Sequence, residues 1–177
     1  MSWISKNNYL TKTEQENNAY ELTMFFKKQE PQWTSEAISA MLGNMESESS
    51  INPGIWENLD EGNLSGGLGL VQWTPATKII NWAGDSWQDG TKQCERIIYE
   101  LENDLQWAMK DDYPLTFLEF TQSTDDPYYL AAVFLNNYER PADILQPWRG
   151  DQALKWYELV KNWFPDIGGK SVYWLFP

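Results

Sequence analysis

The sequence contains no histidine among its 177 residues, and this absence excludes several large classes of enzyme. Zinc hydrolases, Ser-His-Asp enzymes and Cys-His enzymes all use an imidazole in their usual forms. Acid–base chemistry must therefore fall on carboxyl groups, tyrosine or lysine. The single cysteine, Cys94, excludes an internal disulfide framework and is expected to be buried on a helix. We expect no metal and no organic cofactor.

Basic residues and long apolar runs are also scarce. Thirteen Lys and Arg stand against 26 Asp and Glu, so the net charge is −13. Binding to nucleic acid depends largely on basic side chains that neutralise phosphates, so this charge argues against nucleic acid and against an anionic membrane surface. No segment approaches the roughly 18 consecutive apolar residues of a membrane span, and we expect no signal peptide at the start.

Aromatic residues, in contrast, are abundant: 11 Trp, 9 Tyr and 7 Phe. Such side chains fill cores, but they also line sites that hold sugars, bases or other flat ligands. The length suits one domain with a hydrophobic core of its own. We therefore expect part of the aromatic content to line a groove.

Helical patterns cover most of the chain. Thr11 and Thr34 stand at N-cap positions before helical runs that extend to about Lys28 and to Ser49. Further helices are expected from Pro75 to Ala83, over residues 91–110, from Pro127 to before Pro141, and over residues 150–164.

One segment breaks this helical pattern. Residues 55–73 consist of short apolar pieces separated by "ENLDEGNLSGG", which predicts a small β-hairpin lobe. The sequence therefore predicts an α+β fold, mostly helical. Residues 1–164 would form the domain, and residues 165–177 a C-terminal tail or linker.

Two glutamates stand near the end of the second helix, in "GNMESESSINPG". At about 100° per residue, Glu48 shares the apolar face of Met41 and Met45. Glu46 falls on the rim of that face and is expected to be solvated. An apolar surrounding and the negative end of the helix dipole both raise the pKa of a carboxyl group, so Glu48 could protonate a leaving oxygen. The alternative is that the helix ends by Ser47 and that Glu48 is an ordinary loop acid.

A second candidate segment is "GGLGLVQWTP", residues 66–75. Its glycines permit a close approach of backbone to a ligand. Gln72 offers an amide that both donates and accepts hydrogen bonds, and Trp73 offers a large flat face. A pyranose presents hydroxyl groups on its edge and C–H groups on its face, so this pair suits a sugar. The alternative is a glycine-rich turn that leads into a buried tryptophan.

Taken in order and spacing, "ESSINPG", "GLGLVQWTP" and "NYERP" resemble the phage tail lysozyme family of the lysozyme-like superfamily, as found in tail-tip lysins of small podoviruses. Goose-type lysozymes and soluble lytic transglycosylases are more distantly similar. The resemblance extends over residues 17–164 and implies a lysozyme-like fold. It also implies that Glu48 is the general acid, that Gln72 and Trp73 line the hairpin side of a cleft, and that Tyr138 faces the catalytic glutamate.

A second carboxyl group is less clearly marked. Inverting glycosidases hold a base about 6.5–9.5 Å from the acid, and retaining ones a nucleophile at about 5–5.5 Å. "WENLDEGN" supplies candidates in the lobe that should face Glu48: Asp60 is preferred, with Glu61 or Glu57 possible instead. Trp56 is a further candidate for stacking on a sugar. A transglycosylase needs no second acid, because the 6-hydroxyl group of the sugar attacks.

The resemblance implies a virion protein at the tail tip, with phage tail proteins and peptidoglycan glycan strands as partners. It would hydrolyse the β-1,4 bond between N-acetylmuramic acid and N-acetylglucosamine during host entry. One alternative is a lytic transglycosylase that acts on the same bond, and another is a non-catalytic glycan-binding tail module. Because bacterial walls are anionic, a net charge of −13 should slow association from solution. We therefore expect an adsorbed virion to hold the domain against the wall.

Overall fold

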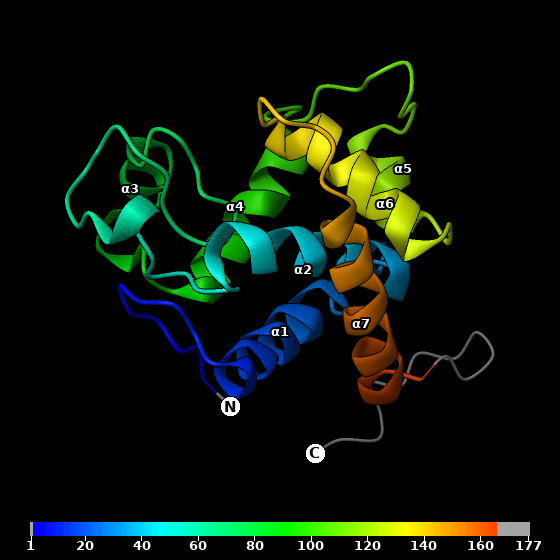
Figure 1. Cartoon of the computed structure of the whole chain (residues 1–177), viewed down its shortest axis with the longest axis horizontal. Coiled ribbons are helices and arrows are strands. Elements are labelled where there is room, and N and C mark those ends of the chain that lie inside the picture. Colours follow the sequence, from blue (N-terminus) through cyan, green and yellow to red (C-terminus); the bar gives the residue numbers. More distant parts are fainter. Residues whose placement is uncertain (1, 166–177) are drawn as a thin grey trace.

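The computed structural model describes residues 2–165 and is built around one central helix. Figure 1 shows this helix, α2 (Ser35–Ser49), with α1 (Lys12–Phe26), α6 (Pro127–Phe134) and α7 (Pro147–Trp163) arranged around it. Between Ser35 and Met45, every residue of α2 except Glu36 is buried. A helix that is buried on all sides forms the core of its domain, so the other helices take their positions from α2.

The N-terminal caps predicted for the first two helices are confirmed. The Thr11 side chain accepts a hydrogen bond from the backbone of Glu14, and the Glu14 carboxylate accepts one from the backbone of Thr11. The Thr34 hydroxyl likewise accepts from the backbone of Ala37. These bonds satisfy backbone N–H groups that a helix start otherwise leaves unpaired.

The residue at which α2 ends determines whether Glu48 belongs to the helix. The helix continues through Ser49, and Ser50 adopts a left-handed conformation with φ 57° that ends it. Glu48 therefore lies within the last turn, and the alternative that the helix stops by Ser47 is wrong.

The remaining helices agree with the sequence in part. They are α3 (Thr77–Ala83), α4 (Gly90–Glu102), α5 (Phe117–Gln122), the 3-10 turns η1 (Glu57–Leu59) and η2 (Gly84–Ser86), and the π-helical turn η3 (Leu135–Glu139). Pro127 opens α6 as expected, whereas α7 begins earlier than expected, at Pro147, and α5 was not predicted. The helix expected to start at Pro75 begins at Thr77.

The prediction of one long helix over residues 91–110 is wrong beyond Glu102. Asp104 and Gln106 have φ values of 52° and 63°, which a right-handed helix cannot contain. The apolar spacing that continues to Leu105 and Met109 belongs to a loop in which both side chains are exposed. Apolar periodicity alone therefore overestimated the length of this helix.

The predicted β-hairpin lobe is also wrong. In its place residues 52–76 form an irregular segment, here called the loop lobe, and within it the structure shows a single isolated bridge, between Trp56 and Leu68. Positive φ values recur along it, at Asn58, Gly62 and Gly69 among others, and these prevent two extended strands from pairing. The mostly helical character of the fold is confirmed.

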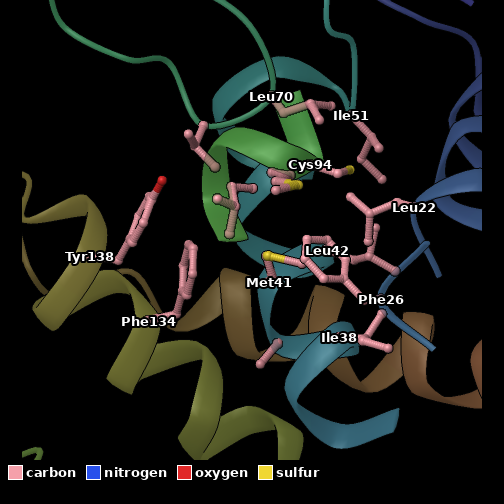
Figure 2. Close-up of a cluster of buried hydrophobic side chains, with 14 of the residues drawn as sticks. Leu22, Phe26, Ile38, Met41, Leu42, Ile51, Leu70, Cys94, Phe134 and Tyr138 are labelled. Atoms are coloured by element: carbon pink, nitrogen blue, oxygen red, sulfur yellow. The ribbon is translucent and has the colours of Figure 1, made fainter. Parts of the chain in front are cut away.

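The core gathers around α2. Figure 2 shows Met41 and Leu42 of α2 among Leu22 and Phe26 of α1, with Phe134 on the opposite side. Cys94 also lies in this cluster and is buried, as predicted.

Two further predictions concern the C-terminal tail and the absence of a membrane span. The predicted tail, residues 165–177, lies outside the described residues except for its first position. Among residues 2–165, no helix combines the length and the apolar character that crossing a bilayer requires.

The two helices α2 and α7 are in close contact at Gly43. A Cβ atom added there would lie 2.5 Å from the backbone oxygen of Arg149 and 2.7 Å from the backbone nitrogen of Ala153. Backbone atoms cannot rotate out of the way, so any side chain at this position would push α7 away from α2.

Gly43→Ala should therefore destabilise the protein. Alanine gains up to about 1 kcal/mol in helix propensity, but overpacking costs about 1–3 kcal/mol. We expect Tm to fall by about 2–8 °C in differential scanning calorimetry. Glu16→Ala, on the exposed side of α1, is the control and should leave Tm nearly unchanged. A Gly43→Ala variant that melts at or above the wild-type temperature would contradict this packing.

Candidate active site

A cleft of about 500 Å³ lies between the loop lobe and the helical body. A second hollow of about 370 Å³ adjoins it, since Val71, Gln72, Thr74 and Glu139 line both. The two together form a groove, which is the shape that an extended polymer requires. In Figure 1 the loop lobe and α3 lie to the left of α2, and α6 and α7 lie to its right.

Glu48 lines this cleft from the last turn of α2. Its side chain is 20% exposed, and its Oε1 accepts a hydrogen bond of 2.6 Å from Nη2 of Arg149. Arg149, on α7, is itself buried and donates further bonds to Asn44 and to Gln146. The guanidinium group is thus fixed between α2 and α7, and it holds the Glu48 carboxylate in one orientation.

Glu46 behaves differently from the sequence expectation. Its side chain is only 15% exposed, it forms an ion pair with Lys12, and it accepts a hydrogen bond of 2.8 Å from the indole of Trp156. The expectation of a solvated Glu46 is therefore wrong, because α1 and α7 cover this rim of α2. Glu46 is not among the residues that line the cleft.

Glu139, at the end of η3, is a third acid of the site and was missed by the sequence analysis. It lines both hollows and is half-buried, and its Oε1 is enclosed with no hydrogen-bond partner among the described residues. Burial and the negative charge of Glu48 raise the pKa of Glu139 well above its usual range, against the opposing effect of Arg149. The motif "NYERP" did contain it, directly after Tyr138.

Behind the groove lies a buried carboxylate, Glu100, which the sequence analysis also missed. Its side chain is 1% exposed and accepts hydrogen bonds from the Nε of Arg96 at 2.9 Å, from the indole of Trp73 at 2.9 Å and from the hydroxyl of Tyr138 at 2.5 Å. Burial and this negative charge raise the pKa of Tyr138 well above its usual range. The four-residue spacing of Arg96 and Glu100 on one helix was the only signal in the sequence.

This network gives Trp73 and Tyr138 positions unlike those expected from the sequence. Trp73 is 2% exposed and Tyr138 1%, and the Tyr138 hydroxyl turns to Glu100 rather than to open space. The Tyr138 ring stacks on Phe134 at 4.5 Å. In the free protein these residues form the wall of the second hollow and offer little surface for a sugar to stack on.

Gln72 and Trp56 lie where a ligand could reach them. Gln72 lines both hollows, and its Nε2 donates to the backbone oxygens of Gly69 and Ile55, so the amide has a fixed orientation. Trp56 lines the cleft although it is 6% exposed, and its ring makes an edge contact of 5.5 Å with Trp87. Only a small part of Trp56 is therefore accessible from the cleft.

The three acids proposed in the lobe occupy different environments. Glu57 lines the cleft, and its Oε2 accepts a hydrogen bond of 2.8 Å from the backbone of Gly67. Asp60 and Glu61 are exposed and line neither hollow. The geometry therefore favours Glu57 over Asp60 as the acid opposite Glu48. Within residues 2–165, no group of three or more acidic or thiol side chains is arranged to hold a metal ion.

Comparison with known proteins shows a family and a named relative to which the chain is similar. The model of the family described as phage tail lysozyme matches residues 6–160. The curated protein "Morphogenesis protein 1" of Bacillus phage B103 is 49% identical over 164 residues, which are 89% of this chain and 43% of that relative. The chain thus spans less than half the length of this relative.

Glu100→Gln should destabilise the protein, because glutamine keeps the shape but removes the charge that Arg96 requires. Breaking a buried ion pair and its charge-assisted hydrogen bonds costs about 2–4 kcal/mol. We expect a fall in Tm of roughly 5–15 °C. Glu102→Gln, at the exposed end of the same helix, is the matched control. Equal melting temperatures for the two variants would show that the Glu100 network contributes nothing.

Proposed function

The chain belongs to the phage tail lysozyme family, and from this premise we propose that it hydrolyses the glycan strands of peptidoglycan. The bond cleaved would be the β-1,4 linkage between N-acetylmuramic acid and N-acetylglucosamine. The observation that carries the proposal is the pair of acids in one groove: Glu48 on the helical side and Glu57 on the side of the loop lobe. We assign the activity to the domain predicted over residues 1–164.

Glu48 acts as the catalytic acid. It protonates the glycosidic oxygen, the bond from that oxygen to the anomeric carbon breaks, and water completes the hydrolysis. Glu57 takes the role of second carboxyl group, which the sequence analysis gave first to Asp60. Gln72 and Trp56 contact the sugars, whereas Trp73 and Tyr138 stabilise the wall of the groove through their hydrogen bonds to Glu100.

The similar phage protein indicates where this reaction would take place. That protein is a morphogenesis protein of a phage, which supports a role in the virion. We place the domain at the tail tip, where adsorption would hold it against the wall of the host. Partners would then be other tail proteins and the glycan itself.

Glu48→Gln tests the proposal directly. Without the acid, the rate of glycan cleavage should fall by about 10²–10⁴-fold. The measurement is mass spectrometry of sugar ends released from purified peptidoglycan. Glu46→Gln, on the same turn but outside the cleft, is the matched control and should retain activity.

The sugar ends also separate the alternatives. New reducing ends that carry the mass of an added water support hydrolysis. Anhydro ends would make the protein a lytic transglycosylase. Release of no fragments by the wild type would leave only a glycan-binding module and would contradict the proposal.

The net charge of −13 leads to a further expectation. The isolated domain should act slowly on intact cells at low ionic strength, and its rate should rise as salt screens the repulsion over a Debye length of about 10 Å at 0.1 M. Turbidity of a cell suspension, followed from about 0.01 to 0.15 M salt, measures this effect. A rate that falls steadily from the first addition of salt would contradict delivery by the virion.

A further inference from the structure

Three carboxyl groups lie within electrostatic reach of one another on the helical side of the groove: Glu48, Glu100 and Glu139. Two guanidinium groups face them, since Arg96 pairs with Glu100 and Arg149 pairs with Glu48. Both guanidinium groups are thus bound to other carboxyl groups. Lys78 and Arg140 also line the second hollow, but among the described residues no ion pair joins either of them to Glu139.

The hydrogen bonds of the three carboxyl groups differ. Glu100 accepts three donors and is fully engaged. Glu48 accepts a bond of 2.6 Å from Arg149, whose other bonds go to Asn44 and Gln146. Glu139 has an enclosed Oε1 with no partner among the described residues.

An enclosed carboxylate oxygen that accepts no hydrogen bond is costly, and the carboxyl group avoids that cost by keeping its proton. The charged and titratable groups around Glu139 come from several elements: Glu48 from α2, Lys78 from α3, Glu100 from α4, Arg149 from α7, and Tyr138 and Arg140, the chain neighbours of Glu139. Across the cleft are Glu57 and Tyr9. Arg149 opposes the retention of the proton, but it is bound to Glu48.

We propose that Glu139 is a positioning residue that shares one proton with Glu48 and stores it while Glu48 is paired with Arg149. This role rests on the function proposed above. Two coupled carboxyl groups that share one proton titrate as a pair, so the proton persists at a pH where a lone glutamate would have lost it. Glu139 would thus keep the catalytic acid supplied with a proton near neutral pH.

Glu48 and Glu139 together provide the proton that the reaction consumes and take up the proton that it releases. The proton stored on Glu139 passes to Glu48, and Glu48 gives it to the glycosidic oxygen as the bond to the anomeric carbon breaks. Water adds to that carbon, and the proton that it releases returns to the carboxyl groups of the site. No oxidant, reductant or metal takes part in these steps.

Glu139→Gln removes the store but keeps the size and polarity of the side chain. Glu48 is then paired with Arg149 and has no neighbouring carboxyl group to return a proton to it. The alkaline limb of the pH profile of kcat should move down by at least about one pH unit, which is about a tenfold loss near pH 8. At acid pH the kcat values of the variant and the wild type should converge. KM should stay within about twofold, because glutamine keeps the size and polarity of the side chain that lines the groove.

Two further variants separate this role from a structural one. Glu139→Asp keeps a carboxyl group and should restore part of the alkaline limb. Glu16→Gln, on the exposed side of α1, changes the net charge equally and should leave the profile unmoved. A loss that is the same at every pH would reflect damaged structure and would overturn the proposal.

A measurement that needs no activity completes the test. Carboxyl ¹³C NMR of the wild type from about pH 3 to 9 should show Glu139 titrating well above the usual range of about 4.3, and Glu48→Gln should lower that value. Titration of Glu139 in the usual range, unaffected by Glu48→Gln, would overturn the proposal whatever the activity.

The two measurements also separate failure of this inference from failure of the proposed function. Coupled titration in a wild type that cleaves no glycan would overturn the function and, with it, the positioning role. Coupled titration in an active wild type whose Glu139→Gln variant keeps an unshifted profile would overturn the positioning role alone.

Discussion

The burial of α2 on all sides from Ala37 to Met45 is the constraint on which the rest of the structure depends. A helix covered on every side cannot turn about its axis, so the carboxylate in its last turn has one possible direction. Arg149 completes this constraint, because it crosses from α7 and bonds both Asn44 and Glu48. The close contact at Gly43 allows α7 to come near enough for that bond. One packed interface therefore determines both the stability of the domain and the geometry of its cleft.

The groove has two walls of different character. The helical wall is regular, and the Glu100 network anchors it by tying Trp73 and Tyr138 to one carboxylate. The opposite wall is the loop lobe, whose backbone bends repeatedly and presents Glu57 to the cleft. In most glycosidases a catalytic acid lies on one side of the scissile bond and a second carboxyl group lies on the other. The proposed proton store, Glu139, lies on the helical side, beside Glu48.

Local features of the sequence predicted local features of the structure. Thr11 and Thr34 cap helices because the bonds involved span three residues, and the apolar face through Met45 placed Glu48 correctly at the edge of the body. The predictions failed where contacts between distant segments of the chain determine the position of a side chain. The hydroxyl of Tyr138 meets a carboxylate 38 positions earlier, which no spacing could reveal. Glu139 was overlooked because its importance comes from what surrounds it and not from its motif.

The central claim is that the cleft beside Glu48 is where a glycan strand is cut. A crystal structure of the Glu48→Gln variant with a bound peptidoglycan fragment tests it most directly. We predict that the oxygen joining an N-acetylmuramic acid to the next sugar lies within hydrogen-bond distance of the side chain at position 48, with Glu57 on the other side of that sugar. A fragment bound outside the groove, or bound in it with no glycosidic oxygen near position 48, would contradict the account.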